Sequence, residues 1–209
     1  GRLAQWVGYS PAMLRASAAH FPGVGWLAAL VAGSVYALFF IALPDNGLTP
    51  LAAAVACTIA TVLLTGGFHE DGLADVADGL GGSAERQRAL DIMKDSRVGA
   101  FGAMALVLAL LFKVALLATL GSEGLDAALA ALLGGQVLSR FLPLLLVRAL
   151  PHVGDAANSK SKPLADQITR GALACAALWC FVPLARMAYM EGALFLIAPV
   201  ITSALALLW

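Results

Sequence analysis

The stretch LTPLAAAVACTIATVLLTGGFHEDGLADVADG, residues 48–79, joins an apolar run directly to an acidic one. The first part, 48–64, carries no charge and has about the length that a helix needs to cross a bilayer core of roughly 30 Å. Gly66 and Gly67 follow, and beyond them come one histidine and four acids within a few turns of chain. The sequence therefore predicts a membrane helix that ends at the edge of the bilayer, next to an acidic segment.

The rest of the chain repeats the apolar pattern. Of 209 residues, 61% are hydrophobic and 12% are charged, which is far more apolar than a soluble domain. Outside 48–64, apolar runs cover 24–43, 99–120, 125–147, 171–190 and 193–209. We therefore expect an all-α protein, a polytopic transmembrane helical bundle of about six spans in a single membrane domain, 1–209. A formal net charge of zero gives no sign of a nucleic-acid partner.

Lysine and arginine are concentrated in three polar segments, 1–22, 66–99 and 148–170. The opposite connections are acidic, with only Arg186 nearby. Because positive residues near span ends stay on the cytoplasmic side, both large polar loops are predicted to be cytoplasmic.

The acidic segment has a spacing that suggests chemistry. If it is helical, Asp71, Asp75 and Asp78 stand at i, i+4 and i+7 and share one face. Like charges at this spacing repel, so a bound cation is a natural compensation. Oxygen ligands favour Mg²⁺, Mn²⁺ or Ca²⁺. The alternative interpretation is a solvated acidic turn.

A second cluster follows the flexible residues 81–83. Asp91 and Asp95 again repeat at i, i+4, so two facing helices would present five carboxylates around a metal pair. Such a pair holds the attacking and leaving oxygens in phosphoryl transfer. Lys94 and Arg97 would then contact phosphate. The sequence therefore predicts metal-dependent phosphoryl transfer.

Three further features are each open to more than one interpretation. His69 adjoins the acids and is a general base, a metal ligand or a helix-end hydrogen-bonding group. Arg140 lies inside an apolar run, where a charge either binds substrate phosphate or carboxylate or makes a structural ion pair. Lys160 and Lys162 form a basic patch that binds either anionic lipid or substrate phosphate.

Four blocks of sequence carry a resemblance to a known family. They are Phe21-Pro22-Gly23-Val24-Gly25, the long block Thr65 to Asp75 continued by Ala77-Asp78-Gly79, the block Ile92-Met93-Lys94-Asp95-Ser96-Arg97-Val98-Gly99, and Ser139-Arg140. Together they resemble the cobalamin synthase family, adenosylcobinamide-GDP ribazoletransferase. The pattern Asp75-x-x-Asp78-Gly79 with Asp91-x-x-x-Asp95 also looks like part of the CDP-alcohol phosphotransferase signature.

The resemblance implies a reaction, a cofactor and a location. A ribose hydroxyl of α-ribazole, or of its 5′-phosphate, would attack the cobinamide-linked phosphorus of adenosylcobinamide-GDP and expel GMP. The implied cofactor is Mg²⁺, with Mn²⁺ as a substitute, and the implied location is the bacterial cytoplasmic membrane. Homo-oligomers are left open.

The site residues expected on both grounds fall into three groups. Asp95 and His69 are the candidate bases. The metal ligands would be Asp71, Asp75, Asp78, Asp91 and Asp95. The substrate contacts would be Glu70, Lys94, Ser96, Arg97, Arg140, Lys160 and Lys162. The rival hypothesis from another class is a divalent-cation transporter that uses the same carboxylates as a permeation site.

Overall fold

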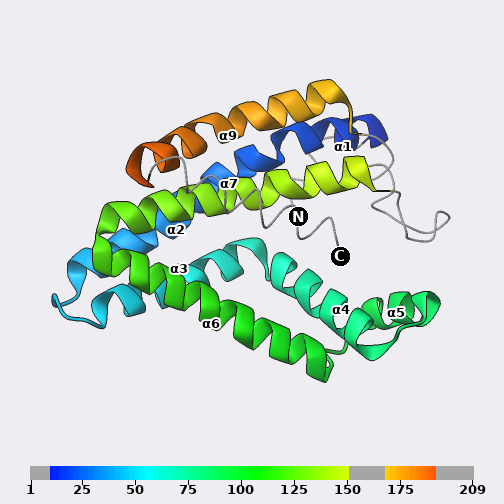
Figure 1. The fold of residues 1–209 in the computed structure, drawn as a ribbon, viewed down its shortest axis with the longest axis horizontal. Helices are drawn as coiled ribbons and strands as arrows, with labels where there is room; N and C mark the ends of the chain where they lie inside the picture. The colour runs from blue at the N-terminus through cyan, green and yellow to red at the C-terminus, as the bar shows by residue number, and fades with distance from the viewer. Residues whose placement is uncertain (1–9, 151–167, 192–209) are drawn as a thin grey trace. The chain divides into compact units, whose positions relative to one another are not determined.

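The computed structural model describes residues 10–150 and 168–191 (Figure 1). Within these ranges the chain is helical and contains no strand. The elements are α1 (Pro11–Ser17), the short 3-10 helix η2 (Ala18–His20), α2 (Phe21–Ala42), α3 (Thr49–Thr65), α4 (Phe68–Gly82), α5 (Arg86–Met93), α6 (Ala100–Glu123), α7 (Leu125–Ala149) and α9 (Arg170–Glu191).

The helices confirm a polytopic membrane protein. In the described part of the chain, four helical stretches are long and apolar enough to cross a bilayer, namely Ala12–Ala42, Ala100–Glu123, Leu125–Ala149 and Arg170–Tyr189. The pair formed by α3 and α4 is a fifth if it counts as one broken span. The sequence predicted about six spans, five of them on described residues, where four or five are found. The sixth expected span, 193–209, lies outside them.

The break between α3 and α4 has a clear backbone cause. Gly66 and Gly67 have φ values of 65° and 71°, in the left-handed region that favours glycine. The N–H of Gly67 donates to the carbonyl of Val62 at 2.9 Å, which closes the last turn of α3. The helix axis then turns by 88°, so the acidic helix leaves the direction of the membrane helix.

The chain divides into two compact units, Leu30–Ala131 and the combination of Gly1–Ala29 with Leu132–Trp209. In the first unit, α6 packs against both α3 and α4, and α5 packs against α4. Tyr36 is completely buried there, and its hydroxyl donates to the carbonyl of Leu117 at 3.3 Å. Gly121 leaves the room that this ring needs, because a Cβ at that position would overlap the hydroxyl. The acidic helix is therefore attached to a packed helical framework.

In the second unit, a proline shapes α9. Pro183 has no N–H, so the carbonyl of Trp179 loses its normal helical donor. The indole N–H of Trp26 donates to that carbonyl at 3.1 Å and replaces the missing bond. Without water in a bilayer core, such replacement allows a proline to remain inside a spanning helix. Gly25 allows α2 to lie close to the backbone of α7 at this point, because a Cβ added to Gly25 would lie 2.5 Å from the carbonyl oxygen of Gln136.

Candidate functional site

Helix α4 carries the first acidic cluster, and the solvent exposure of its three aspartates decreases along the helix. The segment is helical, as the spacing argument requires, and Asp71, Asp75 and Asp78 follow one another along it. Asp71 is exposed, Asp75 is half-buried and Asp78 is only 8% exposed. The three acids therefore meet different surroundings although they share a helix face.

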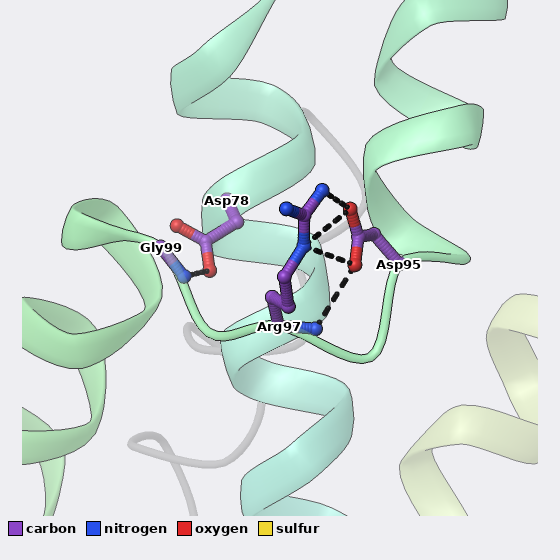
Figure 2. Close-up of polar contacts among 4 residues, drawn as sticks. All are labelled: Asp78, Asp95, Arg97 and Gly99. Atoms are coloured by element: carbon purple, nitrogen blue, oxygen red, sulfur yellow. Dashed lines mark hydrogen bonds and ion pairs between the residues drawn. The ribbon is translucent and has the colours of Figure 1, made fainter.

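Both carboxylate oxygens of Asp78 accept hydrogen bonds from backbone N–H groups at the start of α6. Its Oδ2 accepts a hydrogen bond from the Gly99 N–H at 2.7 Å, and its Oδ1 accepts one from the Gly102 N–H at 2.8 Å. Figure 2 shows the carboxylate directed at Gly99. The first N–H groups of a helix lack partners within the helix and carry partial positive charge. Asp78 thus caps α6 from a different helix.

The surroundings of Asp75 raise the pKa of its carboxyl. Partial burial raises the pKa of the Asp75 carboxyl, and the negative charges of Asp71 and Asp78 raise it further. Both effects disfavour the charged form. A cation beside Asp71 and Asp75 would relieve the repulsion, as the sequence argument expected.

The loop between α5 and α6 holds the second cluster. Asp91 accepts from the side-chain amide of Gln87 at 3.2 Å, one turn earlier in α5. Asp95 makes a two-oxygen ion pair with Arg97, with Nη2 to Oδ2 at 2.6 Å (Figure 2). Hydrogen bonds from Arg97 lower the pKa of the Asp95 carboxyl to about 2. Asp95 is therefore ionised at neutral pH.

The five predicted metal ligands do not converge in this structure. Across residues 10–150 and 168–191, no group of three or more His, Cys, Asp or Glu side chains is placed to hold a metal ion. Helices α4 and α5 do pack together, as the two-helix hypothesis requires. Joint ligation by all five carboxylates stays a prediction.

The remaining candidates surround these clusters. His69 lies exposed in the first turn of α4 with its ring edge-on to Phe68, at 5.6 Å between centroids. Glu70 follows, and its Oε2 is buried without a hydrogen-bond partner among the described residues. Lys94 caps the end of α5, and Ser96 is exposed in the loop. All four belong to the same compact unit as the acids.

Of the three other predicted substrate contacts, the structure describes one. Arg140 belongs to the second unit, and its Nη1 donates to the backbone and side-chain oxygens of Gln136 at 2.7 and 2.8 Å. Lys160 and Lys162 lie outside the described residues.

Gly99 and Gly102 are the site residues that sequence reasoning missed. One signal was present, because α6 begins at a glycine and so has no capping side chain of its own. An apolar helix that starts without Ser, Thr, Asp or Asn needs an acceptor from elsewhere, and a nearby acidic helix supplies one.

The fold and the site define a polytopic helical membrane protein with an acidic helix and loop attached to its spanning helices. A family model described as "Cobalamin-5-phosphate synthase" matches residues 3–209, and the chain belongs to this family, as its motifs predicted. A Polaromonas species protein, named adenosylcobinamide-GDP ribazoletransferase, is 63% identical over all of this chain and 79% of its own length.

Two more relatives carry the same name. The protein from Polaromonas naphthalenivorans is 61% identical over all of this chain and 79% of its own length. The protein from Albidiferax ferrireducens is 63% identical over 92% of this chain and 69% of its own length. No solved structure is significantly similar to the chain.

Proposed function

We propose that this protein is a Mg²⁺-dependent phosphotransferase of the bacterial cytoplasmic membrane. It joins α-ribazole, or α-ribazole 5′-phosphate, to adenosylcobinamide-GDP and releases GMP. The products are adenosylcobalamin, or its 5′-phosphate, and GMP. The family and the names of the relatives support the predicted enzyme class, a transferase of cobalamin biosynthesis.

The observation that carries the metal proposal is the exposed part of the α4 acid face. Asp71 and Asp75 stand one turn apart, with charges close enough to raise the pKa of Asp75. Mg²⁺ commonly binds through one or two carboxylates together with substrate phosphates and water. The two carboxylates of Asp71 and Asp75 fit that mode, whereas the described part of the chain contains no closed cage of metal ligands. Asp91 and Asp95 are further candidate ligands.

The chain's own residues supply binding and proton transfer. A metal ion held by Asp71 and Asp75 would neutralise negative charge on the diphosphate. Lys94 and Arg97 lie on the loop before α6, and they are proposed to hold phosphate oxygens through charge-assisted hydrogen bonds. The ribose hydroxyl forms the new P–O bond, its proton passes to a base, and the bond to GMP breaks.

The two candidate bases differ in how readily they accept a proton, and we propose His69. The pKa of Asp95 is lowered to about 2, so this carboxylate binds a proton poorly at neutral pH. Catalysis by a general base is most efficient when its pKa lies near the operating pH. Imidazole is the side chain that meets this condition most readily, which favours His69 over Asp95.

The test is product formation by the purified protein in lipid nanodiscs. Adenosylcobinamide-GDP, α-ribazole and Mg²⁺ are supplied, and corrinoid product and GMP are quantified by mass spectrometry. We expect equal amounts of both products, no reaction after chelation of the metal, and recovery when Mg²⁺ is restored. Corrinoid product without GMP would contradict the proposed bond cleavage.

The broken α3–α4 pair favours a second candidate, a divalent-cation transporter. Transporters often place ligands at discontinuous helices, and here the 88° break lies just before the acids. Flux of Mn²⁺ into proteoliposomes, measured in parallel with product formation, separates the two functions. Metal flux without transfer would establish the transporter, and transfer without flux would exclude it.

A further inference from the structure

We propose that Asp78 is a positioning residue that fixes the loop 94–99 beside α4, and is not a metal ligand. The inference rests on the proposed transferase function, because that loop carries Lys94, Asp95 and Arg97. The acidic face of α4 then has two parts: an exposed part that meets substrate and metal, and a buried part that positions the loop.

The hydrogen bonds of Asp78 define this role. Each carboxylate oxygen accepts one backbone N–H from the first turn of α6, at 2.7 and 2.8 Å. The side chain is buried, so these donors replace the water that an exposed carboxylate would bind. A carboxylate at a helix N-terminus is also stabilised by the helix dipole. The contact joins residues 21 and 24 positions apart in the chain.

The two glycines of α6 make room for this contact. The three atoms nearest to a Cβ added to Gly99 would all belong to the Asp78 carboxylate, with the nearest oxygen at 2.5 Å. A Cβ added to Gly102 would overlap the other carboxylate oxygen and approach the carbonyl of Ala74 at 2.9 Å. The start of α6 thus fits around the Asp78 carboxylate, and substitution at Gly99 disturbs that carboxylate first.

The position of Asp78 explains how it acts on the reaction. Gly99 ends the loop that begins with Lys94, so the Asp78–Gly99 bond anchors one end of that loop to α4 (Figure 2). The other end is set by α5, which packs on α4 through Gly79 and Met93. Loss of the Asp78 contact frees the α6 end of the loop. Asp71 and Asp75 keep their mutual spacing, because both belong to α4.

The first test separates metal binding from catalysis. Wild type, Asp78→Asn and Asp71→Asn are compared for Mn²⁺ binding by electron paramagnetic resonance and for transferase kcat with Mg²⁺. For Asp78→Asn we expect unchanged Mn²⁺ affinity and a kcat lower by on the order of a hundredfold, the effect of misplacing reacting groups by about 1 Å. Asp71→Asn should weaken Mn²⁺ binding itself.

The second test is a double-mutant cycle. Gly99→Ala should lower kcat and thermal stability in the wild type, and should have almost no effect in Asp78→Ala, where the atoms it would meet are gone. Asp78→Ala removes the carboxylate and Gly99→Ala crowds it, so the two single variants perturb the same contact from opposite sides. Additive effects in the cycle would overturn the inference.

The outcomes distinguish this inference from the proposed function. An active wild type with Mn²⁺ binding weakened equally by Asp78→Asn and Asp71→Asn would make Asp78 a ligand and overturn the inference alone. A folded wild type without transferase activity would overturn the proposed function and the positioning role together. In that case the double-mutant cycle, measured by thermal stability, would still show whether Asp78 caps α6.

Discussion

The turn between α3 and α4 offers a matched pair of substitutions. A Cβ added to Gly67 or to Gly72 meets no atom within 4 Å, so neither Gly67→Ala nor Gly72→Ala creates a clash. The two positions differ in backbone conformation, because Gly67 has φ 71° and Gly72 lies within α4. Any difference in the free energy of unfolding between the two variants therefore measures the cost of the left-handed conformation at Gly67.

The expected magnitude follows from two opposing effects. Alanine stabilises by about 0.4–1 kcal/mol wherever it restricts the unfolded chain without native strain. At Gly67 the left-handed conformation adds a cost of about 1–2 kcal/mol for an L-residue. The first effect is common to both variants and cancels in the comparison. We therefore expect Gly67→Ala to be about 1–2 kcal/mol less stable than Gly72→Ala.

The assay is reversible unfolding in mixed micelles of dodecyl maltoside and SDS, followed by circular dichroism. The double variant Gly66→Ala with Gly67→Ala should be less stable than either single variant, since both residues have positive φ. Equal free energies of unfolding for Gly67→Ala and Gly72→Ala would refute the argument that left-handed glycines shape this turn.

Three other predictions concern single contacts. Arg97→Gln should raise the pKa of Asp95 from about 2 towards 3.8, and a carboxyl ¹³C NMR titration measures this change. Any stabilisation from the pair is present above pH 3.8 and is lost as the pH falls through 2. Trp26→Phe should cost about 1 kcal/mol of unfolding free energy, and less in a Pro183→Ala background, where the helix regains its own donor. Gly25→Ala should destabilise by about 1–3 kcal/mol in the same assay, because the new methyl group meets α7 backbone.

Each of these has a control. Arg88 is exposed, so Arg88→Gln should leave the Asp95 titration unchanged, and an equal effect would reject the specific ion pair. Equal costs of Trp26→Phe with and without Pro183 would reject the carbonyl argument. A Cβ at Gly135 on α7 meets nothing within 4 Å, so Gly135→Ala should be harmless where Gly25→Ala is not.

Local pattern explains what the sequence could predict of the fold. Apolar runs of sufficient length place α2, α6, α7 and α9 close to their expected ranges, since a spanning helix must satisfy its own backbone. The sequence predicted that the membrane helix ends near Gly66 and Gly67, and it did not predict the direction of the next helix. Its 88° angle depends on dihedral angles that adjacent glycines permit but do not dictate.

The secondary structure of the candidate segment was predictable, and the surroundings of its residues were not. Helical spacing correctly placed Asp71, Asp75 and Asp78 on one helix, but it could not show that Asp78 is buried. The burial of Asp78 depends on α6, more than twenty residues later, which no local pattern encodes. The pairing of Asp95 with Arg97 likewise depends on the shape of one loop.

The most direct test of the central claim is transferase activity measured against Mg²⁺ concentration for wild type, Asp71→Asn and Asp75→Asn in nanodiscs. Asp71 is exposed and Asp75 half-buried, so both variants should fold, which thermal unfolding verifies. We predict Mg²⁺-dependent formation of cobalamin product and GMP by the wild type, and loss of this activity in both variants. Full turnover by both folded variants would contradict the assignment of the α4 acid face to metal binding.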